Sequence, residues 1–155
     1  MKTKTITLTD KQFLSILKTV YLGNWLANAY SIDTFKKDYE SAEDFIFCQA
    51  PKFGFKKFVD HKKSDGQKYY PTRSFEEDTD VQKVIQEYDE ETFWEELAER
   101  LGLRDFIKKY SKSQIKKMTR DEYFQKFTDC VDYYNLEFER YGIDRFIISP
   151  KSNKK

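Results

Sequence analysis

The chain contains four sequence signals for the start of a helix, and they constrain its fold more than any other feature. In each signal a threonine or serine is followed three residues later by glutamine or glutamate, which is the pattern of a capping box. The four pairs are Thr9 with Gln12, Thr79 with Gln82, Ser111 with Gln114, and Thr119 with Glu122. Such side chains satisfy backbone amides that a helix leaves free in its first turn. The pattern therefore predicts a chain of separately capped helices.

Apolar residues recur every three or four positions around these signals, as they do on the buried face of a helix. The spacing predicts helices at about 10–30, 32–50, 79–101, 103–110 and 120–141. Gly102 is expected to end one helix as a left-handed cap, and Gly142 follows the last one. We therefore predict a mainly α fold, a bundle of about five to seven helices.

Aromatic residues make up 17% of the 155 residues, whereas hydrophobic residues as a whole make up only 39%. Because Phe, Tyr and Trp each bury a large area, they can form an aromatic-rich core for a single domain over residues 1–149. Residues 150–155 are predicted to form a flexible basic tail. The runs 5–8 and 145–149 are rich in β-branched residues, and they can pair as a small two-stranded ribbon that joins the termini.

Several functional classes find no support in the sequence. No apolar run approaches the roughly 18 to 20 residues of a membrane span, and the first residues lack the apolar stretch of a secretion signal. We therefore expect a cytoplasmic protein with no membrane partner. Cys48 and Cys130 lie far apart without a CxxC motif, and we interpret them as small buried hydrophobes. The single histidine, His61, has no nucleophile motif beside it, so no catalytic residue, metal site or cofactor is predicted.

Charge is segregated along the chain although the formal net charge is only +1. Residues 51–73 contain seven Lys/Arg and two Asp/Glu, a net charge of +5. Residues 74–99 contain one Lys/Arg and eleven Asp/Glu, a net charge of −10. Residues 100–126 contain nine Lys/Arg and three Asp/Glu, a net charge of +6. Such blocks favour association with a partner of complementary charge.

The basic block 52–73 interleaves cations with aromatics, as nucleic-acid-binding loops do. The candidate residues are Lys56, Lys57, Lys62, Lys63, Lys68, Tyr69, Tyr70 and Arg73. Arginine occurs only once among them, although bidentate phosphate recognition favours arginine. A solvated lysine-rich loop and a protein-binding loop are therefore the competing interpretations.

The last predicted helix carries apolar side chains on a second side. At about 100° per residue, Tyr133 and Leu136 point away from the main apolar stripe. Either the helix is buried on both sides, or this side faces a partner. With the carboxylates Glu87, Glu95 and Glu99 of the acidic block, Tyr133 and Leu136 are the predicted partner-binding residues.

These observations favour a non-catalytic cytoplasmic protein that binds another protein, in a regulatory or inhibitory role, through its acidic and basic surfaces. Nucleic-acid binding by residues 52–73 is the alternative. An enzyme that uses buried carboxylates is a third hypothesis, and it requires an Asp or Glu in a pocket with a strongly shifted pKa. A homodimer through residues 130–141 would also use the unpaired apolar surface.

Overall fold

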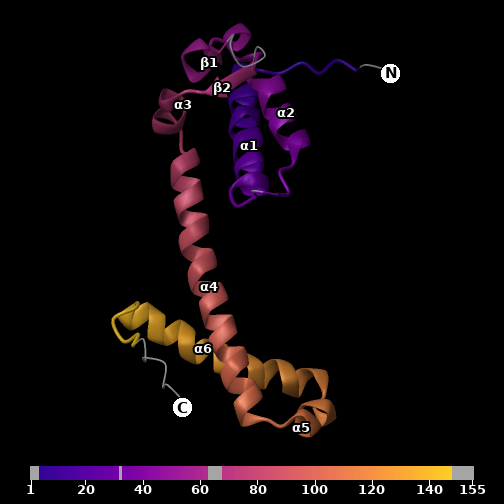
Figure 1. Cartoon of the computed structure of the whole chain (residues 1–155), viewed down its shortest axis with the longest axis vertical. Coiled ribbons are helices and arrows are strands. Elements are labelled where there is room, and N and C mark those ends of the chain that lie inside the picture. Colours follow the sequence, from indigo (N-terminus) through magenta and orange to yellow (C-terminus); the bar gives the residue numbers. More distant parts are fainter. Residues whose placement is uncertain (1–3, 32, 63–67, 148–155) are drawn as a thin grey trace. The chain divides into compact units, whose positions relative to one another are not determined.

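The computed structural model describes residues 4–31, 33–62 and 68–147, and it is mainly helical (Figure 1). Its α-helices are α1 (Asp10–Asn28), α2 (Lys37–Phe47), α3 (Arg73–Asp78), α4 (Val81–Lys109), α5 (Lys112–Lys117) and α6 (Arg120–Tyr141). Two 3-10 turns, Ala50–Phe53 and Lys56–Phe58, precede the strands β1 (Val59–Lys62) and β2 (Lys68–Pro71). The predicted mainly α fold is confirmed. None of the described helices combines the length and the apolar character that a bilayer span requires.

The chain divides into two compact units, Met1–Gln86 and Glu87–Lys155. Helix α4 begins in the first unit and ends in the second. The expectation of one domain over residues 1–149 stays a prediction. The predicted tail, residues 150–155, lies outside the described residues.

Three of the four predicted capping boxes are present, at Thr9, Ser111 and Thr119. The prediction for Thr79 is wrong. Its hydroxyl donates to the Phe75 carbonyl at 2.7 Å at the end of α3, and α4 begins at Val81. A short helix that the sequence pattern did not reveal lies directly before Thr79, so the hydroxyl bonds back to the fourth residue before it.

The second helix is shorter than predicted, because α2 covers only residues 37–47 of the predicted 32–50. The Asn28 side chain accounts for part of the difference. Its amide oxygen accepts from the Lys36 backbone amide at 2.7 Å, and its amide nitrogen donates to the Lys36 carbonyl at 3.2 Å. These bonds hold the chain in a non-helical conformation just before α2 starts.

The two-stranded ribbon exists, but it does not join the termini. Strands β1 and β2 pair antiparallel, with Val59 opposite Pro71 and His61 opposite Tyr69. Residues 5–8 form no strand, and nor do 145–147, while 148–149 lie outside the described residues. The paired strands mix lysine, aspartate and histidine with aromatics, so they lack the alternating apolar pattern by which strands are recognised in a sequence.

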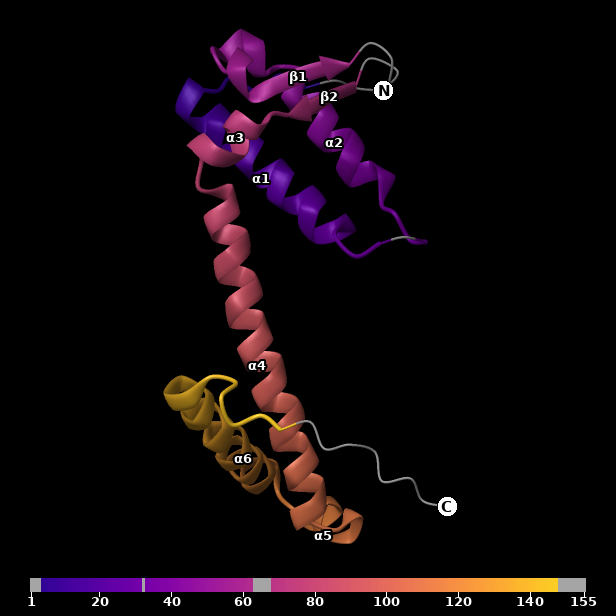
Figure 2. The ribbon, with the colours of Figure 1, turned by 60° about the vertical axis from the view of Figure 1, so that its left-hand side comes forward.

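Aromatic side chains form the core of the first unit. Phe75 is fully buried, and its ring meets those of Tyr21, Phe47 and Phe58 edge-on at 5.1 to 5.6 Å. Figure 2 shows α1 and α2 side by side, with the ribbon at the end where α1 begins. The buried cluster consists of Phe13, Leu17, Phe47, Ala50, Phe58, Phe75 and Val81.

In the second unit, α4 and α6 pack closely where Gly102 meets Val131. A Cβ atom placed on Gly102 would lie 2.8 Å from Val131 Cγ2 and 3.0 Å from the Val131 amide nitrogen. The prediction that Gly102 caps a helix is therefore wrong, because α4 continues past it to Lys109. Gly142, in contrast, does end α6, with a φ of 51°. Phe106 is buried beside this crossing, and its ring contacts those of Tyr123 and Phe127.

We predict opposite effects for two glycine-to-alanine substitutions inside helices. Gly102→Ala should lower the free energy of unfolding of the second unit by about 1 to 3 kcal/mol, because the added methyl forces α4 and α6 apart. Gly23→Ala, in α1, has nothing within 4 Å of the new methyl. It should raise stability by about 0.5 to 1 kcal/mol, since alanine loses less backbone entropy than glycine on folding. Urea unfolding followed by circular dichroism measures both changes, and a neutral or stabilising Gly102→Ala would contradict the close crossing.

Candidate functional site

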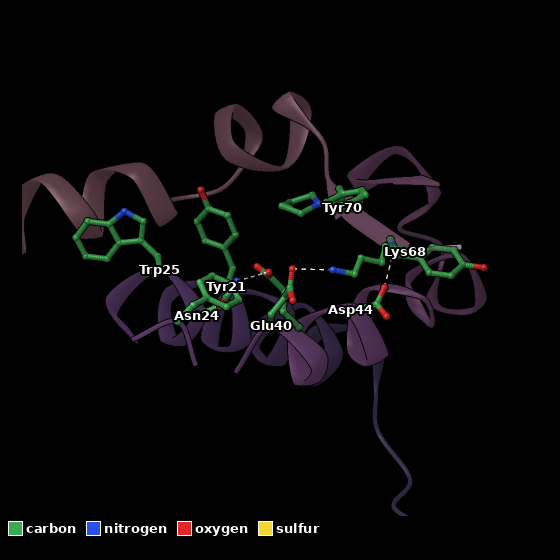
Figure 3. Close-up of a pocket in the computed structure, with 11 residues that line it drawn as sticks. Tyr21, Asn24, Trp25, Glu40, Asp44, Lys68 and Tyr70 are labelled. Carbon is green, nitrogen blue, oxygen red and sulfur yellow. Dashed lines mark hydrogen bonds and ion pairs between the residues drawn. The ribbon is translucent and has the colours of Figure 1, made fainter. Parts of the chain in front are cut away.

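A pocket of about 300 Å³ lies in the first unit, between α1, α2 and β2 (Figure 3). Its apolar and aromatic walls consist of Tyr21, Trp25, Phe35, Tyr69, Tyr70 and Pro71. Its polar groups are Asn24, Glu40, Glu43, Asp44 and Lys68. The pocket thus combines three carboxylates and one ammonium group with a largely aromatic wall.

Helical spacing explains how the sequence builds this pocket. Residues three and four apart lie on the same face of a helix. Helix α1 contributes Tyr21, Asn24 and Trp25 at this spacing, and α2 contributes Glu40, Glu43 and Asp44. Phe35 lies just before α2, and strand β2 supplies the rest of the wall, from Lys68 to Pro71.

Two of the three carboxylates have strong internal partners. The Lys68 ammonium donates to Glu40 Oε1 at 2.9 Å, and Figure 3 shows the Lys68 side chain extending toward Glu40. Asp44 Oδ1 accepts the backbone amide of Tyr69 at 2.6 Å. Both contacts join α2 to β2, so they hold the walls together as well as compensating the two carboxylates.

Among residues 4–31, 33–62 and 68–147, no cation donates a hydrogen bond to Glu43. Its Oε2 accepts from the neutral Asn24 side-chain amide at 2.6 Å. Burial raises the pKa of Glu43 to about 7, and the charges of Glu40 and Asp44 add to the rise, while the bond from Asn24 opposes it. Glu43 therefore titrates near neutral pH, and its charged form has no cation beside it within the described part of the chain.

Tyr21 forms part of the wall, but its hydroxyl is committed elsewhere. The hydroxyl donates to Glu76 Oε1 at 2.8 Å and accepts from the Gln82 side-chain amide at 3.1 Å. Burial and the neighbouring Glu76 carboxylate raise the pKa of Tyr21 well above its usual range. Tyr21 therefore stays neutral, and it offers the pocket its ring rather than a reactive oxygen.

Chemically, the pocket suits an organic cation, because aromatic rings and carboxylates both attract one. Within the described part of the chain, no three His, Cys, Asp or Glu side chains form a group suited to a metal ion. The hypothesis of a carboxylate-dependent enzyme required a pocket carboxylate with a shifted pKa. Glu43 meets that requirement, so the hypothesis stays a prediction.

The predicted partner-binding residues all lie in the second unit. Tyr133 and Leu136 on α6 are 63% and 52% exposed, so the interpretation that α6 is buried on both sides is wrong for these two side chains. Glu87, Glu95 and Glu99 are exposed on α4. The structure leaves this surface accessible, and its binding role stays a prediction.

Those predicted nucleic-acid-binding residues that the structure describes lie on and beside the β1–β2 ribbon. Three of the cations are paired with carboxylates: Lys57 with Asp78 at 2.7 Å, Lys68 with Glu40 at 2.9 Å, and Arg73 with Glu77 at 2.6 Å. The Tyr69 ring stacks on His61 with ring centres 4.5 Å apart. Tyr70 lines the pocket, Lys56 is exposed, and the Lys62 side chain and Lys63 lie outside the described residues. The three paired cations are less available for phosphates than the sequence implied.

Sequence reasoning missed the pocket, because it used the helix over 32–50 only for its apolar stripe. The carboxylates at 40, 43 and 44 were a usable signal, since they share one helix face. Their partners Asn24 and Lys68 are 19 and 28 residues away from Glu43 and Glu40, respectively, and only folding brings them close. Comparison of the chain with models of protein families gave no match, and nor did comparison with characterised proteins or with solved structures.

Glu43 should make the stability of the first unit depend on pH. Its pKa is higher in the folded chain than in the unfolded chain, so the folded form loses stability as pH rises from about 4.5 to 7. Glu43→Gln removes this loss and keeps an oxygen for Asn24. The free energy of unfolding of the variant, relative to that of the parent, should therefore rise by about 1 to 2 kcal/mol between pH 5 and pH 8, after allowance for solvent screening.

Trp25 reports on this unit if Trp94 is first replaced by phenylalanine, since these are the only two tryptophans. Urea unfolding of the Trp94→Phe chain, with and without Glu43→Gln, gives the comparison from Trp25 fluorescence. An equal difference in stability at both pH values would show that Glu43 titrates normally.

Proposed function

We propose that this protein is a non-catalytic protein-binding module, and that its pocket receives a lysine or arginine side chain of a partner protein. The observation that carries the proposal is the Glu43 carboxylate inside an aromatic-walled pocket, with no cation bonded to it among the residues that the structure describes. A bound cation would supply a charged partner.

A bound cation would stabilise the charged form of Glu43. Without a cation, Glu43 must stay protonated near neutral pH or bear an unpaired, half-buried charge. An entering ammonium or guanidinium group can pair with this carboxylate and rest against the aromatic wall of the pocket. Both contacts favour a cation over a neutral side chain of similar shape.

The wider charge pattern supports a basic partner. Residues 74–99 carry eleven carboxylates and one lysine, and Glu87, Glu95 and Glu99 are exposed within them. A surface of this sign raises the association rate of a positively charged protein. The pocket would then supply specificity at one side chain.

A regulatory or inhibitory role in the cytoplasm belongs to the same proposal. The cytoplasmic part of the proposal is supported by the two thiols, since Cys48 and Cys130 are both free and half-buried. Unpaired cysteines are typical of a reducing compartment.

A titration with a lysine analogue tests the pocket directly. Nα-acetyl-lysine N-methylamide should shift the NMR resonances of pocket residues with a Kd of about 1 mM, the affinity expected for a ligand of about 14 heavy atoms. The norleucine analogue has the same chain without the charge, and it should bind at least about tenfold more weakly. Binding of the lysine analogue should also tighten from pH 6 to pH 8 as Glu43 ionises.

Two variants with the same change in net charge distinguish the effect of the pocket carboxylate from that of the protein's overall charge. Glu43→Gln should weaken binding of the lysine analogue about tenfold at pH 8, since one buried charge pair is lost. Glu95→Gln, at an exposed site on α4, should leave binding unchanged. Equal binding of the norleucine analogue, or equal losses in the two variants, would overturn the proposal.

A further inference from the structure

Helix α4 carries an exposed stripe that exists only because the helix continues through Gly102. The stripe consists of Phe93, Glu96, Arg100, Leu103 and Ile107, and we call it the outer face of α4. These residues are separated by alternating steps of three and four, which is the spacing of the seam in a coiled coil. The five side chains therefore lie along one side of the helix.

The outer face lies opposite the side of α4 that α6 covers. Ala98 and Phe106 are buried, and Gly102 touches Val131. Phe93, Leu103 and Ile107 are instead 51%, 42% and 56% exposed. Large apolar side chains in a row on an exposed helix face indicate a surface that packs against something.

Charge along the same helix is polarised. Residues 87–99 contain seven Asp/Glu and no Lys/Arg, whereas residues 100–109 contain four Lys/Arg and one Asp. At the centre of the outer face, Arg100 pairs with Glu96 at 2.8 Å. The face is thus acidic toward one end, basic toward the other, and apolar on both sides of a central ion pair.

We infer that the outer face of α4 binds a second copy of the chain, with the two α4 helices antiparallel about a two-fold axis. In this register Phe93 of each copy lies opposite Leu103 of the other, and Glu96 of each lies opposite Arg100 of the other. The acidic half of each helix then runs beside the basic half of its partner. The same two-fold operation pairs Phe93 with Leu103 and Glu96 with Arg100, while Ile107 lies beyond these pairs, opposite Asp89.

Other arrangements satisfy the face less well. Parallel pairing would place Glu96 against Glu96 and Arg100 against Arg100, which is repulsive. A wholly basic or wholly acidic partner would complement one half of the helix and repel the other. The paired positions of the seam span only about three turns, from Phe93 to Leu103. We therefore expect a weak dimer whose population depends on concentration.

Charge reversal tests the dimer on the full chain. Sedimentation equilibrium from about 10 to 500 µM should show a monomer–dimer equilibrium. Glu96→Arg and Arg100→Glu each place like charges across the axis, and each should weaken dimerisation at least tenfold. The double variant, Glu96→Arg with Arg100→Glu, restores opposite charges and should return to within about threefold of the parent. Circular dichroism checks that every variant folds.

Cysteine cross-linking tests the direction of the helices. In a chain with Cys48→Ser and Cys130→Ser, oxidation should link Phe93→Cys chains to Leu103→Cys chains, because these positions face each other across the axis. Chains of one kind alone should link poorly. Preferential linkage of 93 to 93, or of 103 to 103, would show a parallel dimer and overturn the inference.

A further variant identifies the surface. Tyr133→Ser with Leu136→Ser alters the exposed side of α6 and should leave dimerisation unchanged. A monomer at every concentration, or a dimer that depends on Tyr133 and Leu136 but not on Glu96 and Arg100, would also overturn the inference. The result is independent of the cation pocket, because every substitution in the outer face lies outside the first unit.

Discussion

The first unit depends on the burial of one phenylalanine. Phe75 lies in the short helix α3, and its ring contacts Tyr21 of α1, Phe47 of α2 and Phe58 of the second 3-10 turn. Edge-to-face contacts of this kind have preferred geometry, so they orient the elements as well as holding them together. Tyr21 then donates to Glu76, the residue after Phe75, which orients one wall of the pocket. Removal of the Phe75 ring would therefore disturb the pocket as well as the core.

The pocket places a charge where the fold does not compensate it. Glu40 and Asp44 are held by Lys68 and the Tyr69 amide, whereas Glu43, among the described residues, is held by the neutral Asn24 amide alone. A core selected for stability alone would have an apolar residue or a full ion pair at this position. Local costs of this kind are typical of binding sites, because the missing interaction is the one that a ligand can supply. The raised pKa of Glu43 and the proposed binding of a basic side chain thus have the same cause.

The packing of the second unit depends on Gly102, which has no side chain. Gly102 lets α4 and α6 approach until its Cα hydrogens face the Val131 backbone, and larger residues would not fit there. The close crossing buries Phe106 beside it and keeps α4 unbroken. Because the helix is unbroken, residues on both sides of Gly102 share one exposed face. The outer face is thus a consequence of packing on the opposite side of the helix.

The sequence by itself determined the local features of this protein. The capping boxes at Thr9, Ser111 and Thr119 and the end of α6 at Gly142 were predictable, because each depends on residues within one turn. The mainly α class followed from the spacing of apolar residues in the same way. Glu40, Glu43 and Asp44 could have been recognised as one helix face by this reasoning, although not as part of a pocket.

Only the tertiary structure decided the remaining features. The sequence suggested that Thr79 starts a helix and that Gly102 ends one. Those roles were changed by the buried Phe75 and by the approach of Val131, which is 29 residues beyond Gly102. The pocket likewise requires that Asn24, Glu43 and Lys68 meet from three separate elements. Contacts between residues distant in sequence leave no periodic pattern in the chain, because their geometry exists only once the intervening elements have packed.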